Sequence, residues 1–215
     1  MSRQRTRTWF DLHRSALGVG AILVASVTTA GLGGIVITRI GSLALTIPPF
    51  AALLTPALLG VGVAMLASYQ VDLRVLGVRA RSRARRLHSA WLATCVASGL
   101  LCSAMFGLAL EPVPGEAAPT VATLLNGALF IGLSLCVSGA GAPGLTWAPA
   151  VVLFSYAVLD GSPTPALAPV AEVLTTHVST ARVVVACTAL AAGTVSSVVW
   201  VGGSNGPLGR FRVTT

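Results

Sequence analysis

The chain has 215 residues, of which 54% are hydrophobic and only 9% are charged. Soluble domains usually carry about 25% charged residues, so this composition excludes an ordinary water-soluble globule. The formal net charge is +8, but nucleic-acid binding is not expected, because the basic residues cluster without interleaved aromatic side chains or a folded platform.

Five stretches of the chain contain no Asp, Glu, Lys or Arg: 15–38, 40–71, 87–110, 117–159 and 183–209. Each is long enough to cross a bilayer as a helix, which takes about 20 apolar residues. The stretch 117–159 is about twice as long as one crossing. A turn is expected inside it at Gly139, Gly141, Pro143 and Gly144, since Gly and Pro interrupt helices. The sequence therefore predicts an all-α, polytopic membrane protein with six spans.

The expected organisation is a cytoplasmic segment (1–14), one transmembrane domain (15–209) and a cytoplasmic tail (210–215). The six spans are predicted, in chain order, at roughly 16–38, within 43–69, and near 89–110, 120–139, 145–160 and 182–203. A short turn at 39–42 separates the first two. Residues 161–181 form the longest external loop, in which 170–177 is compatible with a short helix.

Residues 3–17 have the pattern of an amphipathic helix that lies in the cytoplasmic headgroup layer and leads into the first span. Arg3, Arg7, Asp11 and Arg14 lie largely opposite its apolar face. We expect Trp9, Phe10 and Leu12 to anchor this helix at the membrane interface.

The distribution of the arginines along the chain predicts its orientation in the membrane. With six spans, one side of the membrane receives twelve of the 14 arginines, and the other receives only Arg39 and Arg182. Cytoplasmic loops carry the excess of basic residues in membrane proteins, so both termini are expected in the cytoplasm of a plasma-membrane protein. An odd number of spans would abolish this asymmetry, which favours an even number.

The densest charge lies in a predicted cytoplasmic loop, 70–88. Its basic residues are Arg74, Arg79, Arg81, Arg83, Arg85 and Arg86. One interpretation is a topology determinant that also meets the anionic cytoplasmic leaflet, at about 1 kcal/mol per basic residue. The other is a docking element for a cytoplasmic partner, with Asp72 at its start. The two interpretations are compatible.

Side chains that carry chemistry are scarce in the predicted spans. Asp72, Glu111, Asp160 and Arg182 all lie at span ends, whereas ion or proton pathways need ionisable groups within the membrane. Asn126 is the strongly polar residue of the fourth span, and we expect it to make an interhelical hydrogen bond.

No catalytic residue, metal site or cofactor is expected. Ser134 superficially resembles a serine nucleophile in its Gly-Leu-Ser-Leu-Cys setting, but His13, His88 and His177 lie at or outside the predicted membrane boundaries. The four cysteines are expected to be packing residues. Small residues four apart predict close helix packing, within the chain or between subunits; they are Ala16/Gly20, Ala30/Gly34, Gly99/Ser103/Gly107 and Ala189/Gly193.

The layout resembles the type-2 ABC exporter permeases (ABC-2) over most of the chain. The segment 7–14 (RTWFDLHR) is similar to the connecting helix of that family, and 72–79 (DLRVLGVR) with the basic run after it is similar to the coupling segment. The segment 165–182 resembles the external loop helix before the last span.

The resemblance implies a permease subunit that pairs with a second permease, as a homo- or hetero-dimer, and with a separate ATP-binding subunit. This chain has no GxxxxGK[ST] phosphate loop of its own. The implied docking residues are Asp72, Arg79, Arg81, Arg83, Arg85 and Arg86. The implied function is export of an amphipathic or lipid-like small molecule or peptide. The alternatives are an accessory or assembly subunit of a larger membrane complex, and a facilitator that works alone.

Overall fold

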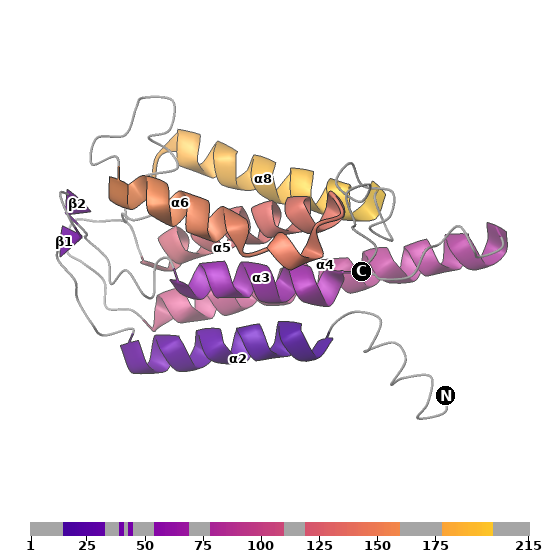
Figure 1. Ribbon diagram of the computed structural model, residues 1–215, viewed down its shortest axis with the longest axis horizontal. Coiled ribbons are helices and arrows are strands. Elements are labelled where there is room, and N and C mark those ends of the chain that lie inside the picture. Colours follow the sequence, from indigo (N-terminus) through magenta and orange to yellow (C-terminus); the bar gives the residue numbers. More distant parts are fainter. Residues whose placement is uncertain are drawn as a thin grey trace, which may run out of the picture.

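The computed structural model describes residues 15–32, 39–40, 43–44, 54–68, 78–109, 119–159 and 178–199. In these ranges the elements are α2 (Ser15–Leu32), β1 (Arg39–Ile40), β2 (Leu43–Ala44), α3 (Thr55–Ala67), α4 (Val78–Leu108), α5 (Pro119–Gly139), the 3-10 helix η3 (Pro143–Leu145), α6 (Ala148–Leu159) and α8 (Thr180–Val199) (Figure 1). The predicted all-α fold is confirmed. The strands are only two residues long and pair as a hairpin, Arg39 opposite Ala44 and Ile40 opposite Leu43, at the turn expected at 39–42.

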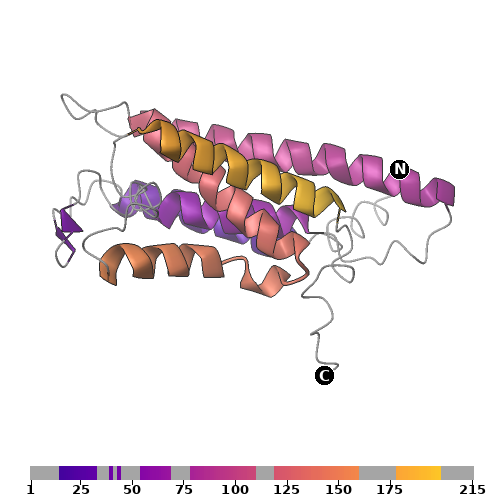
Figure 2. The same ribbon diagram turned by 90° about the horizontal axis from the view of Figure 1, so that it is seen from above.

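Successive helices run in alternating directions, so their ends gather at two ends of the bundle (Figures 1 and 2). At one end, which we call the Ser68 end, the Ser68 hydroxyl lies 2.9 Å from the Ser138 hydroxyl and joins the last turns of α3 and α5. At the other, the Arg182 end, the last turn of α4 at Gly107 packs on the first turn of α5 at Thr120. The first described residues of α2 and the last of α8 both lie at the Ser68 end.

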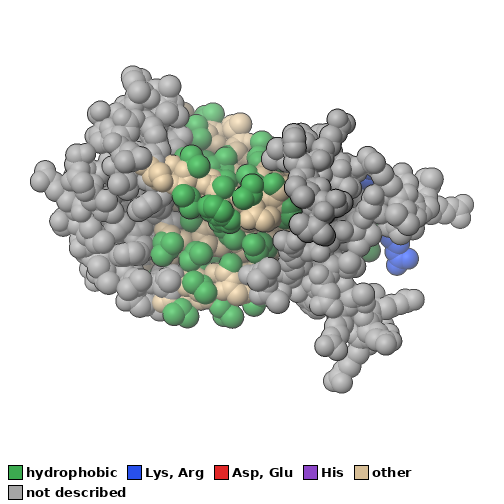
Figure 3. Space-filling model, in the orientation of Figure 1, with side chains coloured by type: hydrophobic (Ala, Val, Ile, Leu, Met, Phe, Trp, Pro, Cys, Tyr) green, Lys and Arg blue, Asp and Glu red, His purple; other side chains and the backbone are tan. Residues whose placement is uncertain are grey.

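Three of the described helices are long and apolar enough to cross a membrane: Ser82–Leu108 in α4, Pro119–Gly139 and Thr180–Val199. Three shorter apolar helices accompany them, Gly18–Val27, Thr55–Ala67 and Pro143–Leu153. Many hydrophobic side chains gather in the middle of the face shown in Figure 3. These features indicate a membrane-embedded protein. Helix α3 lies within the range 43–69 predicted for the second span, and residues 43–44 at the start of that range belong to the hairpin.

The helix ends follow local sequence signals. Pro56 lies in the first turn of α3 and Pro119 begins α5. Proline is favoured in the first turn because the N–H groups there have no hydrogen-bond partner within the helix. Ser179 caps α8, because its hydroxyl accepts a 3.1 Å hydrogen bond from the N–H of Arg182, three residues later.

The turn predicted between 139 and 144 is confirmed. After α5 ends at Gly139, the N–H of Ala142 bonds to the carbonyl of Val137 and the N–H of Gly141 to that of Ser138. This is the Schellman arrangement, which needs a left-handed residue after the helix. Gly141 supplies it, with φ of 97°. The chain therefore reverses within a few residues and enters η3 and α6.

Helix α5 is the centre of the bundle and packs against α3, α4 and α8. Its Ile131 and Leu135 are almost completely buried, in a cluster with Val63 of α3 and Leu92 of α4. Phe130 of α5 is buried in a second cluster, which includes Ala186 of α8. Around this core, small residues let neighbouring backbones approach closely, as expected where lipid replaces water and packing drives association.

Two of the four predicted small-residue stripes, Gly99/Ser103/Gly107 and Ala189/Gly193, pack within this chain, and the stripe Ala30/Gly34 reaches outside the described residues. A Cβ added to Gly99 would strike Val63 and Ile131, and one added to Gly193 would strike the Gly132 carbonyl. Gly20 differs, since a Cβ there would meet nothing within 4 Å. Helix α2 instead approaches α3 through Gly18 and Gly62.

Several predictions lie outside the described residues: the amphipathic helix with Trp9, Phe10 and Leu12, the start of the basic loop with Asp72 and Arg74, the loop 161–177 and the tail 210–215.

Candidate functional site

The second half of the predicted basic loop is helical. Helix α4 begins at Val78 and contains 31 residues, about 46 Å at 1.5 Å per residue. Helix α5 contains 21 residues, about 32 Å. Because the last turn of α4 is level with the first turn of α5, the extra length projects beyond the Ser68 end (Figures 1 and 2). We call residues 78–87 the α4 extension.

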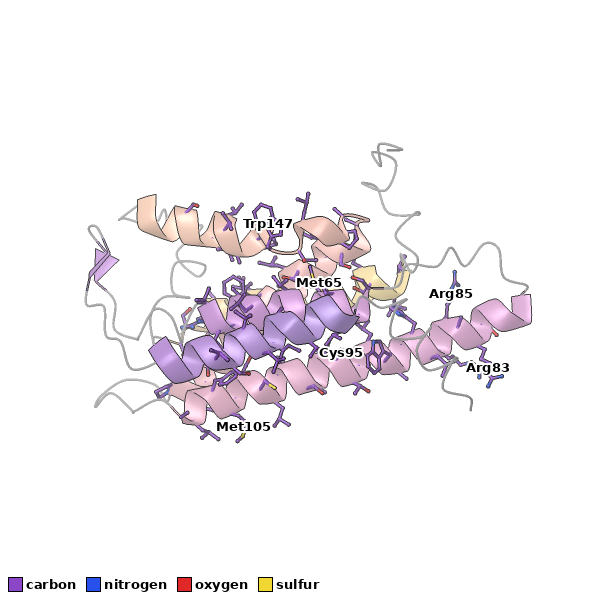
Figure 4. All side chains as sticks on the ribbon, turned by 60° about the horizontal axis from the view of Figure 1, so that its bottom comes forward. Met65, Arg83, Arg85, Cys95, Met105 and Trp147 are labelled. Atoms are coloured by element: carbon purple, nitrogen blue, oxygen red, sulfur yellow. The ribbon has the colours of Figure 1, made fainter. Side chains whose placement is uncertain are left out.

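The α4 extension carries five of the six predicted docking residues. Arg79 and Arg81 lie in its first turn, and Arg83, Arg85 and Arg86 are exposed. Figure 4 shows Arg83 and Arg85 pointing to opposite sides of the helix. Arg85 lies on the side where the rest of the bundle packs, whereas Arg83 points the same way as Met105, away from it.

The α4 extension joins the bundle at His88 and Trp91. The His88 side chain is only 2% exposed, so it is buried within the bundle. The Trp91 indole N–H donates a 2.8 Å hydrogen bond to the carbonyl of Leu66, in the last turn of α3. This bond joins α4 to α3 close to the point where the α4 extension ends. A force on the α4 extension would therefore reach both helices.

A second polar group lies near the opposite end, between α5 and α8. The Arg182 side chain is 2% exposed, and its guanidinium donates a 2.8 Å hydrogen bond to the Asn126 side-chain oxygen. It also donates a 3.4 Å bond to the carbonyl of Ala122. The interhelical hydrogen bond predicted for Asn126 is confirmed.

Arg182 lies in the first turn of α8, at a helix end as predicted, and its side chain is buried between α5 and α8. The sequence contains both partners, an Asn within the fourth span and an Arg at the start of the sixth. It does not reveal that α5 and α8 are neighbours. For this reason the bond between Arg182 and Asn126 could not be predicted from the sequence.

Ser134, the residue with a superficial likeness to a nucleophile, has a structural contact. Its buried hydroxyl donates a 3.0 Å hydrogen bond to the carbonyl of Thr146, just before α6. This bond holds the turn after α5 against the helix. Among the described residues, no group of three or more His, Cys, Asp or Glu side chains could hold a metal ion, and the four cysteines are not joined in disulfides.

No protein-family model matches this chain. Neither a curated protein nor a solved structure is significantly similar to it. The functional argument therefore rests on the residues and their arrangement.

Proposed function

We propose that this chain is the transmembrane permease subunit of an ATP-driven exporter in the plasma membrane. A separate ATP-binding subunit docks on residues 72–86, and a second permease subunit completes the pathway. The observation that carries the proposal is the α4 extension, a basic helix that is continuous with a candidate membrane span. The resemblance of 72–79 and the following basic run to an ABC-2 coupling segment supplies the kind of partner.

In this proposal six helices cross the membrane, namely α2, α3, α4, α5, α6 and α8. The alternation of their directions supports an even number of crossings, with the Ser68 end and both termini in the cytoplasm. Twelve of the 14 arginines then lie on the cytoplasmic side. Helices α3 and α6 contain 13 and 12 residues, about 20 and 18 Å, and a bilayer accommodates such short helices by local thinning.

In the proposed mechanism, α4 transmits movement from the cytoplasmic partner into the membrane. A helix transmits force along its axis, so a partner that moves the α4 extension moves the membrane span of the same helix. The bond from Trp91 to Leu66 carries that movement to α3. The apolar outer faces of the helices suit an amphipathic or lipid-like cargo that reaches the exporter through the bilayer.

The test is reversal of charge on the bundle side of the α4 extension. The double variant R81E/R85E replaces Arg85 and Arg81, which is one helical turn before it, with glutamate. We expect co-purification of the ATP-binding subunit to fall at least about ten-fold, since like charges at an interface cost several kcal/mol. ATP-dependent export of a fluorescent phospholipid should be lost with it.

The matched control is R210E/R212E, which changes the net charge equally on the same predicted side of the membrane. This variant should keep both the partner and the export. Undiminished co-purification and transport in R81E/R85E would refute docking at this site. A complex that purifies without any ATP-binding subunit would favour the accessory or assembly function instead.

A further inference from the structure

The arginines of the α4 extension lie on two faces, and each face continues a different stripe of the membrane-spanning part of α4. Residues three, four or seven apart share one face of a helix. Arg85 is followed at such spacings by His88, Leu92, Gly99 and Ser103, all buried against the bundle. Arg85 therefore lies on the face of α4 that packs against the rest of the bundle.

The other face leads to the lipid. Arg83 and Arg86 are followed at the same spacings by exposed residues: Ala90, Ala97, Leu101 and Leu108. The side chains of Leu101 and Leu108 are 65% and 67% exposed, and apolar groups so exposed on a membrane helix face acyl chains. Figure 4 agrees, since Arg83 points to the same side as Met105, which is also exposed.

The depth of these arginines matches the headgroup layer. The uncharged part of α4 from Leu87 to Leu108 contains 22 residues, about 33 Å of helix. This length nearly equals the hydrocarbon thickness of about 30 Å. Arg86 therefore stands at the first position outside the hydrocarbon, and Arg83 is one turn further out. Long basic side chains at this depth extend toward lipid phosphates.

We propose that Arg83 and Arg86 form a binding site for the phosphate groups of anionic lipids on the outward face of α4. Guanidinium groups bind phosphate oxygens in a planar, bidentate geometry. The opposite face, with Arg85, stays available for a cytoplasmic partner. The site would keep the outward face of the α4 extension at the headgroup layer of the membrane. The inference depends on the membrane location in the proposed function, but not on ATP-driven export.

The test measures lipid binding by native mass spectrometry of the full chain in detergent, titrated with phosphatidylglycerol or with neutral phosphatidylcholine. We compare R83Q/R86Q with R81Q/R85Q, which removes the same charge from the opposite face. At about 1 kcal/mol per basic residue, R83Q/R86Q should weaken phosphatidylglycerol binding about 30-fold, since 1.4 kcal/mol corresponds to a factor of ten. R81Q/R85Q should bind it like the unaltered protein, and phosphatidylcholine binding should not change in either variant.

Several results would overturn the inference. Equal losses in the two variants would mean that the positive charge acts without a defined face. A loss only in R81Q/R85Q, or in neither variant, would place any lipid site elsewhere. Loss of the ATP-binding subunit from R83Q/R86Q, with unchanged lipid binding, would assign this face to the protein partner. Such results leave the R81E/R85E test of docking unaffected.

Two further measurements keep the test valid if R83Q/R86Q does not fold. The variant R83K/R86K keeps the charge but removes the planar fork, so it should retain part of the phosphatidylglycerol preference. Raising the salt concentration should weaken phosphatidylglycerol binding to the unaltered protein, because exposed charges are screened. If salt has no effect, and R83K/R86K binds phosphatidylglycerol no better than phosphatidylcholine, the site does not exist.

Discussion

At the scale of single residues, Arg182 is the least expected feature of the molecule. A guanidinium remains charged in proteins, and its removal from water is expensive unless hydrogen-bond acceptors surround it. Asn126 and the carbonyl of Ala122 are two such acceptors. Both acceptors belong to α5. Because the buried charge of Arg182 needs them, it favours packing of α8 against α5.

This arrangement predicts a large effect of N126L, which removes the acceptor and keeps a side chain of similar size. Loss of a hydrogen bond to a buried charged group costs about 1.5–3 kcal/mol. We expect a lower midpoint in thermal unfolding of the detergent-solubilised protein, followed by circular dichroism.

The double variant N126L/R182M is the control for this interpretation. When both partners become apolar, no buried charge is left without its acceptor, and much of the lost stability should return. A double variant that is less stable than N126L would show that Arg182 stabilises the fold through contacts other than Asn126.

At the scale of helices, glycine decides how closely the elements approach α5. A Cβ at Gly132 would collide with the backbone of Ala189 and Leu190 in α8. Backbone atoms cannot rotate away as a side chain can, so the helices would have to separate. In α2, by contrast, a Cβ added to Gly20 would meet no atom within 4 Å.

The same substitution should therefore have opposite effects at two sites. G132A is expected to destabilise the protein by about 1–3 kcal/mol, the usual cost of overpacking. G20A should be neutral or stabilise by up to about 1 kcal/mol, because Ala has the higher helix propensity. Thermal unfolding midpoints in one detergent give the comparison. Equal effects of the two substitutions would contradict the close α5–α8 crossing.

At the scale of the whole molecule, α6 decides the number of helices that cross the membrane. From residue 80 to the C-terminus, the proposed six-span arrangement has four crossings, α4, α5, α6 and α8. If only the three long apolar helices crossed, α6 would lie on one side and that number would be three. The two arrangements place the C-terminus on different faces relative to residue 80.

Reporter fusions after residues 80, 170 and 215 distinguish these arrangements. We expect the reporters after 80 and 215 to be cytoplasmic and the reporter after 170 to be external. Three crossings would instead put residues 80 and 170 on the same face and the C-terminus on the other. That result would remove the six-span topology and, with it, the cytoplasmic location of the tail arginines used as a control.

The amount of structure readable from the sequence differs between local and long-range features. The missing charges locate α4, α5 and α8, since a helix in lipid needs only an uncharged stretch of sufficient length. The turn after α5 follows from Gly141, because a left-handed residue there favours glycine. These signals are local, so no knowledge of neighbouring helices is needed to interpret them.

Long-range partners depend on which helices pack together, and only the tertiary structure decided that. Nothing in the sequence pairs Arg182 with Asn126, 56 residues away, or shows that Arg83 and Arg85 point to different surroundings. The physical reason is that lipid solvates every apolar face of a helix equally well. Composition therefore determines that the chain enters the membrane, whereas close packing of small residues and buried hydrogen bonds determines which faces meet.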